Sequence, residues 1–370
     1  MCCRRTRAAS PGNAGFPRTT ASTNAGFRHR LQTRQRARGR SVRTLRSIAA
    51  LSIIVLIMVS APTGHAGAQT DPLPSWNATP TKQAILAFVA KVTQNGGANF
   101  VPREQRVAVF DMDGTLVPEK PVPLALIPVL ADIKEAVARK PFLGDKPAVA
   151  ALFNGDHGAL QALGEAGIND LIAVATDGKT TEEIVRNVRP LVAKIQSEKF
   201  GVPYARAVYQ PMRELLAHLE ANGFTTWICS GSPLLITREI APEMFGIPPE
   251  RVMGSTVRTR LDERDGKTVL VFTGQVEHLN DRDGKPVTIN RALGIRPLFV
   301  AGNEGGRGDI AMMRWSRDRD GPSFQLLVNH DDAKREFAYQ EPDNFSLNAA
   351  SKYGFNVVSI KRDWRVVVER

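Results

Sequence analysis

Three short apolar runs, each followed at once by polar or glycine residues, constrain the fold of this chain most. They are Arg106–Phe110 (RVAVF), Phe224–Cys229 and Pro297–Ala301. Runs of this length and composition are typical of strands buried on both faces of a parallel sheet. Strand-like runs also cover 324–328 and 355–360, and segments with helical spacing separate the runs. The alternation predicts an α/β fold with a doubly wound, Rossmann-like parallel sheet.

A long helical block follows the first of these strands. From about Val117 to Tyr209 the apolar spacing is helical, and no strand is predicted there. The sequence therefore predicts that residues 69–116 and 210–370 form the two parts of one core. Residues 117–209 then form an all-helical insertion placed directly after the first core strand. Residues 252–275 read as β-like runs around the turn Asp265-Gly266.

Residues 1–68 have the composition of a leader. The apolar run Ser47–Ala61 is short for a membrane-spanning helix, is preceded by arginines, and is followed by Ala66-Gly67-Ala68, a small-x-small pattern. This pattern predicts an export signal cleaved after Ala68, and hence a periplasmic or secreted protein. An uncleaved membrane anchor is the alternative. We interpret residues 1–41 as a gene-model artefact, with translation starting downstream.

The basic excess of the chain belongs to that leader. The formal net charge is +12, but residues 1–68 hold twelve arginines and no Asp or Glu. From residue 69 onward 37 basic residues face 37 acidic ones. A folded part with no net charge does not carry the basic footprint of a nucleic-acid-binding protein. We therefore expect no nucleic-acid partner.

The residues after the first strand are suited to metal and phosphoryl chemistry. Asp111-Met112-Asp113-Gly114-Thr115 places two carboxylates two residues apart at the carboxyl end of a strand, where open α/β sheets bind ligands. Such a pair can supply a nucleophile, an acid and oxygen ligands for a divalent metal. A calcium loop is excluded, because Val122 stands where that loop has glutamate.

Polar residues also follow the two later strands. Ser230-Gly231-Ser232 ends the second run, where a hydroxyl and backbone N–H groups beside a helix N-terminus make a phosphate site. The third run leads into 302–309, which begins Gly302-Asn303 and ends in Asp309. Lys285 lies just upstream of a short helix near 289–293. The tetrapeptide RDGK occurs twice, at 264–267 and at 282–285. The lysine of the other copy, Lys267, lies in the predicted hairpin turn, so Lys285 is the candidate.

The order Asp-x-Asp, Ser, Lys and Gly-Asn…Asp resembles the four motifs of the haloacid dehalogenase-like superfamily of phosphotransferases. The resemblance covers nearly the whole chain after the leader. It is strongest to the exported, phosphoserine-phosphatase-like branch, in segments such as RVAVFDMDGTL, YQPMRELLAHL and HDDAKREFAY. In that family an insertion at 117–209 is a C1 cap, which closes over the site and favours a small phosphomonoester as the substrate.

The resemblance implies a role for each motif residue. Asp111 attacks phosphorus and forms an aspartyl-phosphate, and Asp113 is the general acid and base. Ser230, with Gly231 and Ser232, binds the phosphoryl group, and Lys285 offsets negative charge. The implied cofactor is Mg²⁺, held by Asp111, the Asp113 carbonyl, Asn303 and Asp309.

The last motif departs from the family pattern. Six positions separate Asn303 from Asp309, about two more than usual, and Asn303 adds no charge. Glu304 is an alternative ligand, although a solvated loop residue is the simpler interpretation. His330-Asp331-Asp332 is interpreted as a strand-end cap.

The resemblance predicts a Mg²⁺-dependent phosphomonoester hydrolase. A phosphotransferase or phosphomutase on the same scaffold, and a non-catalytic binding protein that keeps the fold, are the alternatives, because one fold serves several functions.

Overall fold

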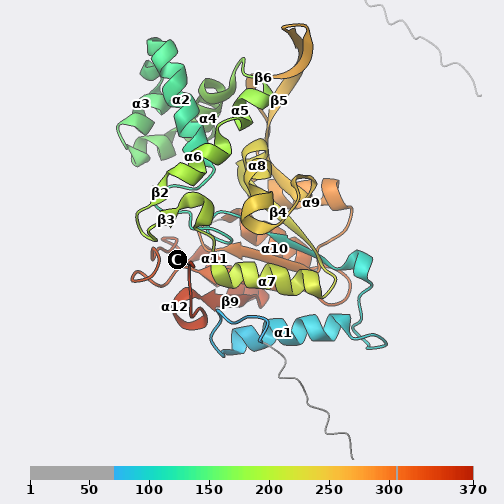
Figure 1. Cartoon of the computed structure of the whole chain (residues 1–370). Helices are drawn as coiled ribbons and strands as arrows, with labels where there is room; N and C mark the ends of the chain where they lie inside the picture. Colours follow the sequence, from blue (N-terminus) through green and yellow to red (C-terminus); the bar gives the residue numbers. More distant parts are fainter. Residues whose placement is uncertain (1–70, 306, 370) are drawn as a thin grey trace, which may run out of the picture. The chain divides into compact units, whose positions relative to one another are not determined.

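The computed structural model describes residues 71–305 and 307–369 (Figure 1). The predicted leader, residues 1–68, lies outside the described residues. The predicted cleavage site after Ala68 and the predicted downstream start of translation lie outside them too. Within the described part, no helix combines the length and the apolar character needed to cross a membrane. The boundaries predicted for the core parts and the insertion stay predictions.

The core is a seven-stranded sheet in the order β6-β5-β4-β1-β7-β8-β9. All neighbouring strands in this sheet run parallel, except β5 and β6. This confirms the predicted α/β fold. The strands of the sheet are β1 (Val107–Phe110), β4 (Thr225–Pro233), β5 (Val252–Arg264), β6 (Lys267–His278), β7 (Phe299–Asn303), β8 (Phe324–Asn329) and β9 (Asn356–Ser359).

The antiparallel pair β5/β6 is a long hairpin closed by Asp265 and Gly266. Both residues have positive φ, 51° and 70°. Two-residue hairpin loops with positive φ at both positions favour Asp-Gly, because this backbone matches the twist of the strands. The turn that the sequence predicts here is therefore confirmed.

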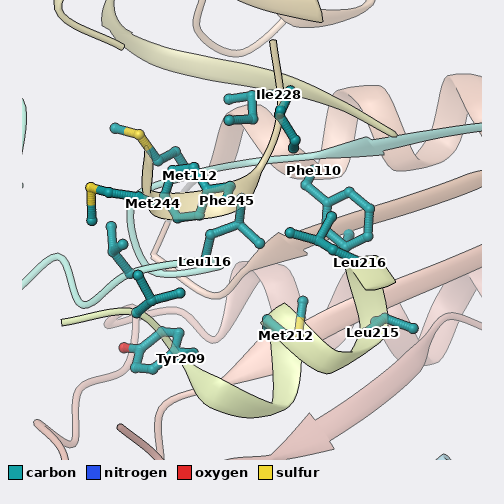
Figure 2. Close-up of a cluster of buried hydrophobic side chains, with 14 of the residues drawn as sticks. Phe110, Met112, Leu116, Tyr209, Met212, Leu215, Leu216, Ile228, Met244 and Phe245 are labelled. Atoms are coloured by element: carbon teal, nitrogen blue, oxygen red, sulfur yellow. The ribbon is translucent and has the colours of Figure 1, made fainter. Parts of the chain in front are cut away.

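Helices cover both faces of the sheet. They are α1 (Pro80–Thr93), α7 (Gln210–Ala221), α8 (Leu234–Phe245), α9 (Gly284–Leu293), α10 (Arg307–Arg317), α11 (Phe345–Tyr353) and α12 (Ile360–Asp363). Because side chains alternate along a strand, β1 contributes to two hydrophobic clusters. Phe110 packs in the cluster that includes α1, α7 and α8 (Figure 2). Val109 packs in the cluster that includes α9, α10 and α11.

The segment between β1 and α7 contains the predicted helices. They are α2 (Leu126–Arg139), α3 (Pro147–Phe153), α4 (His157–Thr176), α5 (Thr181–Val185) and α6 (Val188–Lys194). The segment also holds a short antiparallel pair that the pattern did not predict, β2 (Gln196–Ser197) and β3 (Val202–Pro203). Two residues on each side are too few to give a period-two signal.

The insertion is joined to the hairpin by backbone hydrogen bonds. Gly178 N donates to Phe272 O at 3.0 Å, and Phe272 N donates to Lys179 O at 2.9 Å. Lys179 also pairs with Asp132 of α2 through its ammonium, at 2.7 Å. The sequence pattern gave no sign of this junction, because it joins segments almost a hundred residues apart.

The core cluster around β1 and α7 predicts a large effect of truncation at Leu215, which is fully buried. We expect Leu215→Ala to lower the free energy of unfolding by about 2–5 kcal/mol, since it loses burial and leaves a cavity. The matched control is Leu261→Ala, because Leu261 is 70% exposed in β5. Urea unfolding measures both. Equal losses for the two variants would contradict this account of the core.

Candidate active site

Three loops meet at the carboxyl edge of the sheet because β1, β4 and β7 are neighbouring parallel strands. Asp111 directly follows β1, and its N–H donates to Ala301 O of β7 at 2.9 Å. The register between β4 and β5 shifts between Cys229 and Pro233, so the Ser230–Ser232 segment leaves the regular ladder at the same edge. The order of the strands therefore brings together the polar segments that the sequence singled out.

Lys285 joins two buried carboxylates at the centre of this edge. Its ammonium lies 2.6 Å from Asp111 Oδ1 and 2.5 Å from Asp309 Oδ1. All three residues are at least 95% buried. The second oxygen of Asp309 accepts a hydrogen bond from the backbone N–H of Asn303 at 2.9 Å. One cation thus faces two carboxylates in a region from which water is largely excluded.

Burial and the neighbouring charges shift the pKa values of Lys285 and Asp309. Burial opposes the charge of Lys285, but the carboxylates of Asp111 and Asp309 outweigh it and hold the pKa of Lys285 well above its usual range. Burial, followed by the charge of Asp111, raises the pKa of Asp309 to about 8, although Lys285 works in the opposite direction. The arrangement therefore has room for more positive charge.

Lys285 lies in the first turn of α9, which begins at Gly284. The sequence placed this lysine before a helix that starts near 289, and that expectation is wrong. Pro286 made a helix start before it look unfavourable in the sequence. Proline is nevertheless tolerated in a first turn, because the N–H groups there have no partner within the helix. Lys267, the alternative lysine, is exposed in the hairpin turn.

A second chain of contacts connects Asp113 to the irregular carboxyl end of β4, which includes the Ser230–Ser232 segment that the sequence placed after the strand. Ser232 Oγ donates to Asp113 Oδ2 at 2.7 Å, and Ser232 N donates to Ser230 Oγ at 3.1 Å. Oδ1 of Asp113 is buried and has no hydrogen-bond partner. Burial, above all, raises the pKa of Asp113 to about 7, against the effect of the Ser232 hydrogen bond. An unpartnered buried carboxyl oxygen is available to a ligand.

Two residues that the sequence analysis missed hold the carboxyl end of β4. Ser255 Oγ donates to Gly231 O at 2.6 Å, and Asn280 Nδ2 donates to Ser230 O at 2.8 Å. Asn280 N in turn donates to Ser255 Oγ at 3.0 Å. Neither residue stands in a recognisable motif, so only the tertiary structure identifies them. The nearby Cys229 is inert, because burial raises the pKa of its thiol to about 12.

The side chain of Asn303 lies directly over Gly114. Gly114 has φ +81°, and a Cβ on this residue would lie 2.1 Å from Asn303 Nδ2. Only glycine fits at this position, because a side chain would be strained by the backbone conformation and would also clash. The loop after β1 is therefore packed closely against the carboxyl end of β7, with the Asn303 side chain directly against Gly114.

Glu304 is not the solvated loop residue expected from the sequence. It is fully buried, and its Oε1 accepts a hydrogen bond from the backbone N–H of Glu341 at 3.0 Å. The sequence underestimated its burial, because the segment that covers it lies almost forty residues further along. Asn303, in contrast, bonds to Asp309 through its backbone and lies against Gly114.

The segment after β8 reaches the same loops. His330 Nε2 lies 2.9 Å from Gly114 O, while Asp331 and Asp332 accept hydrogen bonds as caps, from Ser359 and Arg335 among others. The predicted capping role thus describes the two aspartates but not His330, which is 99% buried. The sequence signal that could have identified His330 is a histidine at the carboxyl end of a core strand.

The oxygen donors at this edge fit a hard divalent cation. Two carboxylates share one ammonium, and burial, followed by the charge of Asp111, raises the pKa of Asp309. Mg²⁺ prefers oxygen ligands and keeps several waters. Among the described residues, no group of three or more His, Cys, Asp or Glu side chains is arranged to hold a metal. A cation here therefore needs amide or backbone oxygens as well.

Comparisons with known proteins identify the family. Residues 108–314 match the model of the haloacid dehalogenase-like hydrolases. The chain belongs to this family of hydrolases. The match begins in β1 of the hydrolase, before the Asp111 loop, and ends in α10, beyond Asp309, so it spans every motif described above.

Solved structures similar to this hydrolase come from several bacteria. A functionally unknown protein from Anaerococcus prevotii is 16% identical, with a TM-score of 0.47 over 75% of this chain and 91% of its own. A protein of unknown function from Bordetella pertussis is 18% identical, with a TM-score of 0.45 over 69% and 98%. A phosphoserine phosphohydrolase-like protein from Francisella tularensis is 16% identical, with a TM-score of 0.37 over 66% and 99%. No curated protein matches the chain.

The contact between Gly114 and Asn303 predicts that the site does not tolerate a methyl group. Gly114→Ala combines the cost of a left-handed backbone, about 1–2 kcal/mol, with a clash against Asn303. The matched control is Gly246→Ala, because Gly246 has φ +71° and open space around its Cα. In urea unfolding we expect a clearly larger loss for Gly114→Ala. A loss no greater than that of the control would show that the two loops are not in contact.

Proposed function

We propose that this hydrolase cleaves small phosphomonoesters through an aspartyl-phosphate on Asp111. The observation that carries the proposal is the contact of Lys285 with both Asp111 and Asp309 at the carboxyl edge of the sheet. It supports a site that stabilises negative charge beside an ionised carboxylate. The phosphoryl transition state needs positioning and charge neutralisation more than covalent assistance, so this set of groups is sufficient.

Asp111 is the nucleophile in this proposal. A carboxylate oxygen attacks phosphorus, the ester oxygen leaves, and water then cleaves the aspartyl-phosphate. Lys285 orients Asp111, because its ammonium donates to Oδ1. Thr115 Oγ1 donates to Oδ2 at 3.3 Å, so both oxygens of the nucleophile have a neighbour that sets the orientation of the carboxylate.

Asp113 protonates the leaving oxygen and then removes a proton from water. Its buried, unpartnered Oδ1 supports this role, because a leaving group can occupy that position. Ser232 holds the other oxygen. A positioned acid and base of this kind contributes about 10²–10⁴-fold to the rate. Ser230 and the exposed backbone of Gly231 then bind the phosphoryl oxygens, held in place by Asn280 and Ser255.

We further propose that Mg²⁺ binds at this site through Asp111, the Asp113 carbonyl, Asn303 and Asp309, with waters. When bound, the ion offsets negative charge on the phosphoryl oxygens. Asn303 is the proposed ligand because its side chain lies against Gly114 and its backbone binds Asp309, whereas Oε1 of Glu304 accepts a hydrogen bond from the Glu341 backbone. The helical insertion acts as a cap that excludes water and favours a small substrate.

Export is a separate proposal. The arginine-flanked apolar run and Ala66-Gly67-Ala68 support cleavage after Ala68. It bears on the substrate, because an exported hydrolase meets phosphomonoesters outside the cytoplasm.

Substitution of the two aspartates tests the chemistry. With p-nitrophenyl phosphate as the probe, we expect Asp111→Asn to lower kcat by at least about 10³-fold, since the amide is a poor nucleophile. Asp113→Asn should slow turnover by about 10²–10⁴-fold without unfolding the protein. Lys267→Met is the control for an exposed charge and should leave turnover unchanged. Near-normal turnover by Asp111→Asn would refute the nucleophile.

Trapping of the intermediate separates this proposal from its alternatives. The reaction is quenched with acid during turnover, and the aspartyl-phosphate is reduced with labelled borohydride. Peptide mass spectrometry should then find the label at residue 111 only. Transfer of the group to an added alcohol or sugar phosphate instead of water would favour a phosphotransferase. No label and no phosphate release from a broad panel of esters would favour a binding protein.

Metal removal tests the proposed cofactor. We expect EDTA to abolish phosphate release and Mg²⁺ to restore it, because Lys285 alone does not balance Asp111, Asp309 and a phosphate group. In calorimetry, Asn303→Ala should weaken Mg²⁺ binding, whereas Glu304→Gln should leave it nearly unchanged. Full activity after exhaustive chelation would argue against a metal-dependent reaction.

A further inference from the structure

His330 is a buried group that the proposed chemistry does not use. It follows β8 and is 99% buried, and its Nε2 lies 2.9 Å from the backbone oxygen of Gly114. A carbonyl oxygen only accepts hydrogen bonds, so Nε2 carries the proton and donates it. The imidazole therefore holds the loop that carries Asp111 and Asp113, from a position 216 residues away in the sequence.

Two further side chains fix the orientation of this imidazole. His330 Nδ1 lies 3.2 Å from Glu336 Oε2, and Tyr209 OH donates to Glu336 Oε1 at 2.9 Å. Tyr209 and Glu336 are both fully buried. The contact of Nδ1 with the Glu336 carboxyl group fixes the flip of the ring, and so fixes which ring nitrogen faces Gly114. The carboxylate of Glu336 thus directs Nε2 toward Gly114.

Tyr209 also contacts the nucleophile loop directly. Its backbone N–H donates to Leu116 O at 2.9 Å, two residues beyond the carbonyl that His330 binds. The loop is therefore held at Gly114 and at Leu116 by one connected set of groups. Within the loop, Gly114 N donates to Val117 O at 2.7 Å, which closes the turn.

The same imidazole reaches Asn303, at the carboxyl end of β7, through Tyr339. The two rings are stacked, with centroids 4.3 Å apart and an interplanar angle of 17°. Tyr339 OH lies 3.4 Å from Asn303 Nδ2, and Asn303 in turn lies over Gly114 and binds Asp309. The His330 ring therefore bonds directly to Gly114 in the loop after β1, and it stacks on Tyr339, which contacts Asn303.

We propose that His330 is a positioning residue that keeps the Asp111 loop and the Asn303 loop aligned, with Glu336 and Tyr209 setting its orientation. It acts through the Gly114 carbonyl and through Tyr339, and does not touch the reacting atoms. The proposal rests on the function proposed above. A displacement of about 1 Å at a reacting group costs on the order of 10²-fold in rate, so alignment of these loops affects turnover.

Two isosteric substitutions test the contact with Gly114. Glutamine places its amide N–H near the position of Nε2, whereas asparagine reaches only the position of Nδ1. We expect His330→Asn to lower kcat for p-nitrophenyl phosphate on the order of 10²-fold, with KM changed by less than about threefold. His330→Gln should recover most of that loss. Both variants lose the aromatic stack, but glutamine keeps the Gly114 contact, whereas asparagine keeps only a polar group near Nδ1, beside Glu336.

Hydrogen exchange in the full-length protein gives a readout that needs no turnover. We expect His330→Asn to speed exchange in peptides that cover Asp111–Val117 and in those that cover Asn303 and Asp309. His330→Gln should protect the first loop as the unsubstituted protein does. Tyr339→Phe, which keeps the stack and removes the hydroxyl, should speed exchange in the Asn303 loop alone.

A core variant controls for simple destabilisation. Val92→Ala truncates a fully buried residue in α1, a helix that contributes no residue to the proposed site, and should lower stability while leaving kcat and the exchange of the two loops unchanged. Normal kcat in His330→Asn, or equal damage in the asparagine and glutamine variants, would overturn the proposal. Because the exchange comparison needs no substrate, it separates failure of this inference from failure of the proposed function.

Discussion

The balance between one buried ammonium and two buried carboxylates determines the character of this site. Lys285, Asp111 and Asp309 come from three elements, and each is nearly inaccessible to water. Taking such charges out of water is costly, and mutual attraction compensates only when the geometry is good. The fold provides this geometry because β1 and β7 are neighbours and α9 delivers Lys285 between them. The remaining surplus of negative charge explains why a cation and a phosphoryl group, rather than an apolar ligand, suit the proposed site.

The catalytic loops are held by contacts that lie outside the motifs. Ser255 and Asn280 bond to the carboxyl end of β4, and His330 bonds to the loop after β1. Each of these residues binds a backbone carbonyl, so each controls the path of a loop without entering the reaction. Motif residues supply the proposed chemistry, whereas residues distant in the sequence hold the backbone that carries those motifs in position.

The sequence predicted the strands and the meeting of the loops, because both follow from short-range patterns. Buried parallel strands are continuous apolar runs, and the carboxyl ends of such strands share one edge of the sheet. The burial of Glu304, the start of α9 and the β2/β3 pair were not predicted. The first depends on a segment far along the chain, the second was hidden by Pro286, and the third is too short to leave a pattern. The contact of His330 with Gly114 depends on packing between distant segments, which no local pattern records.

The backbone junction between the insertion and the β5/β6 hairpin has a consequence for association between molecules. Strand β6 is an outer strand of the sheet, and exposed outer strands are templates for pairing with another chain. Gly178 and Lys179 occupy the backbone groups of Phe272 on that strand. The segment proposed to cover the substrate therefore also occupies backbone groups in the middle of this strand to which another chain would otherwise pair.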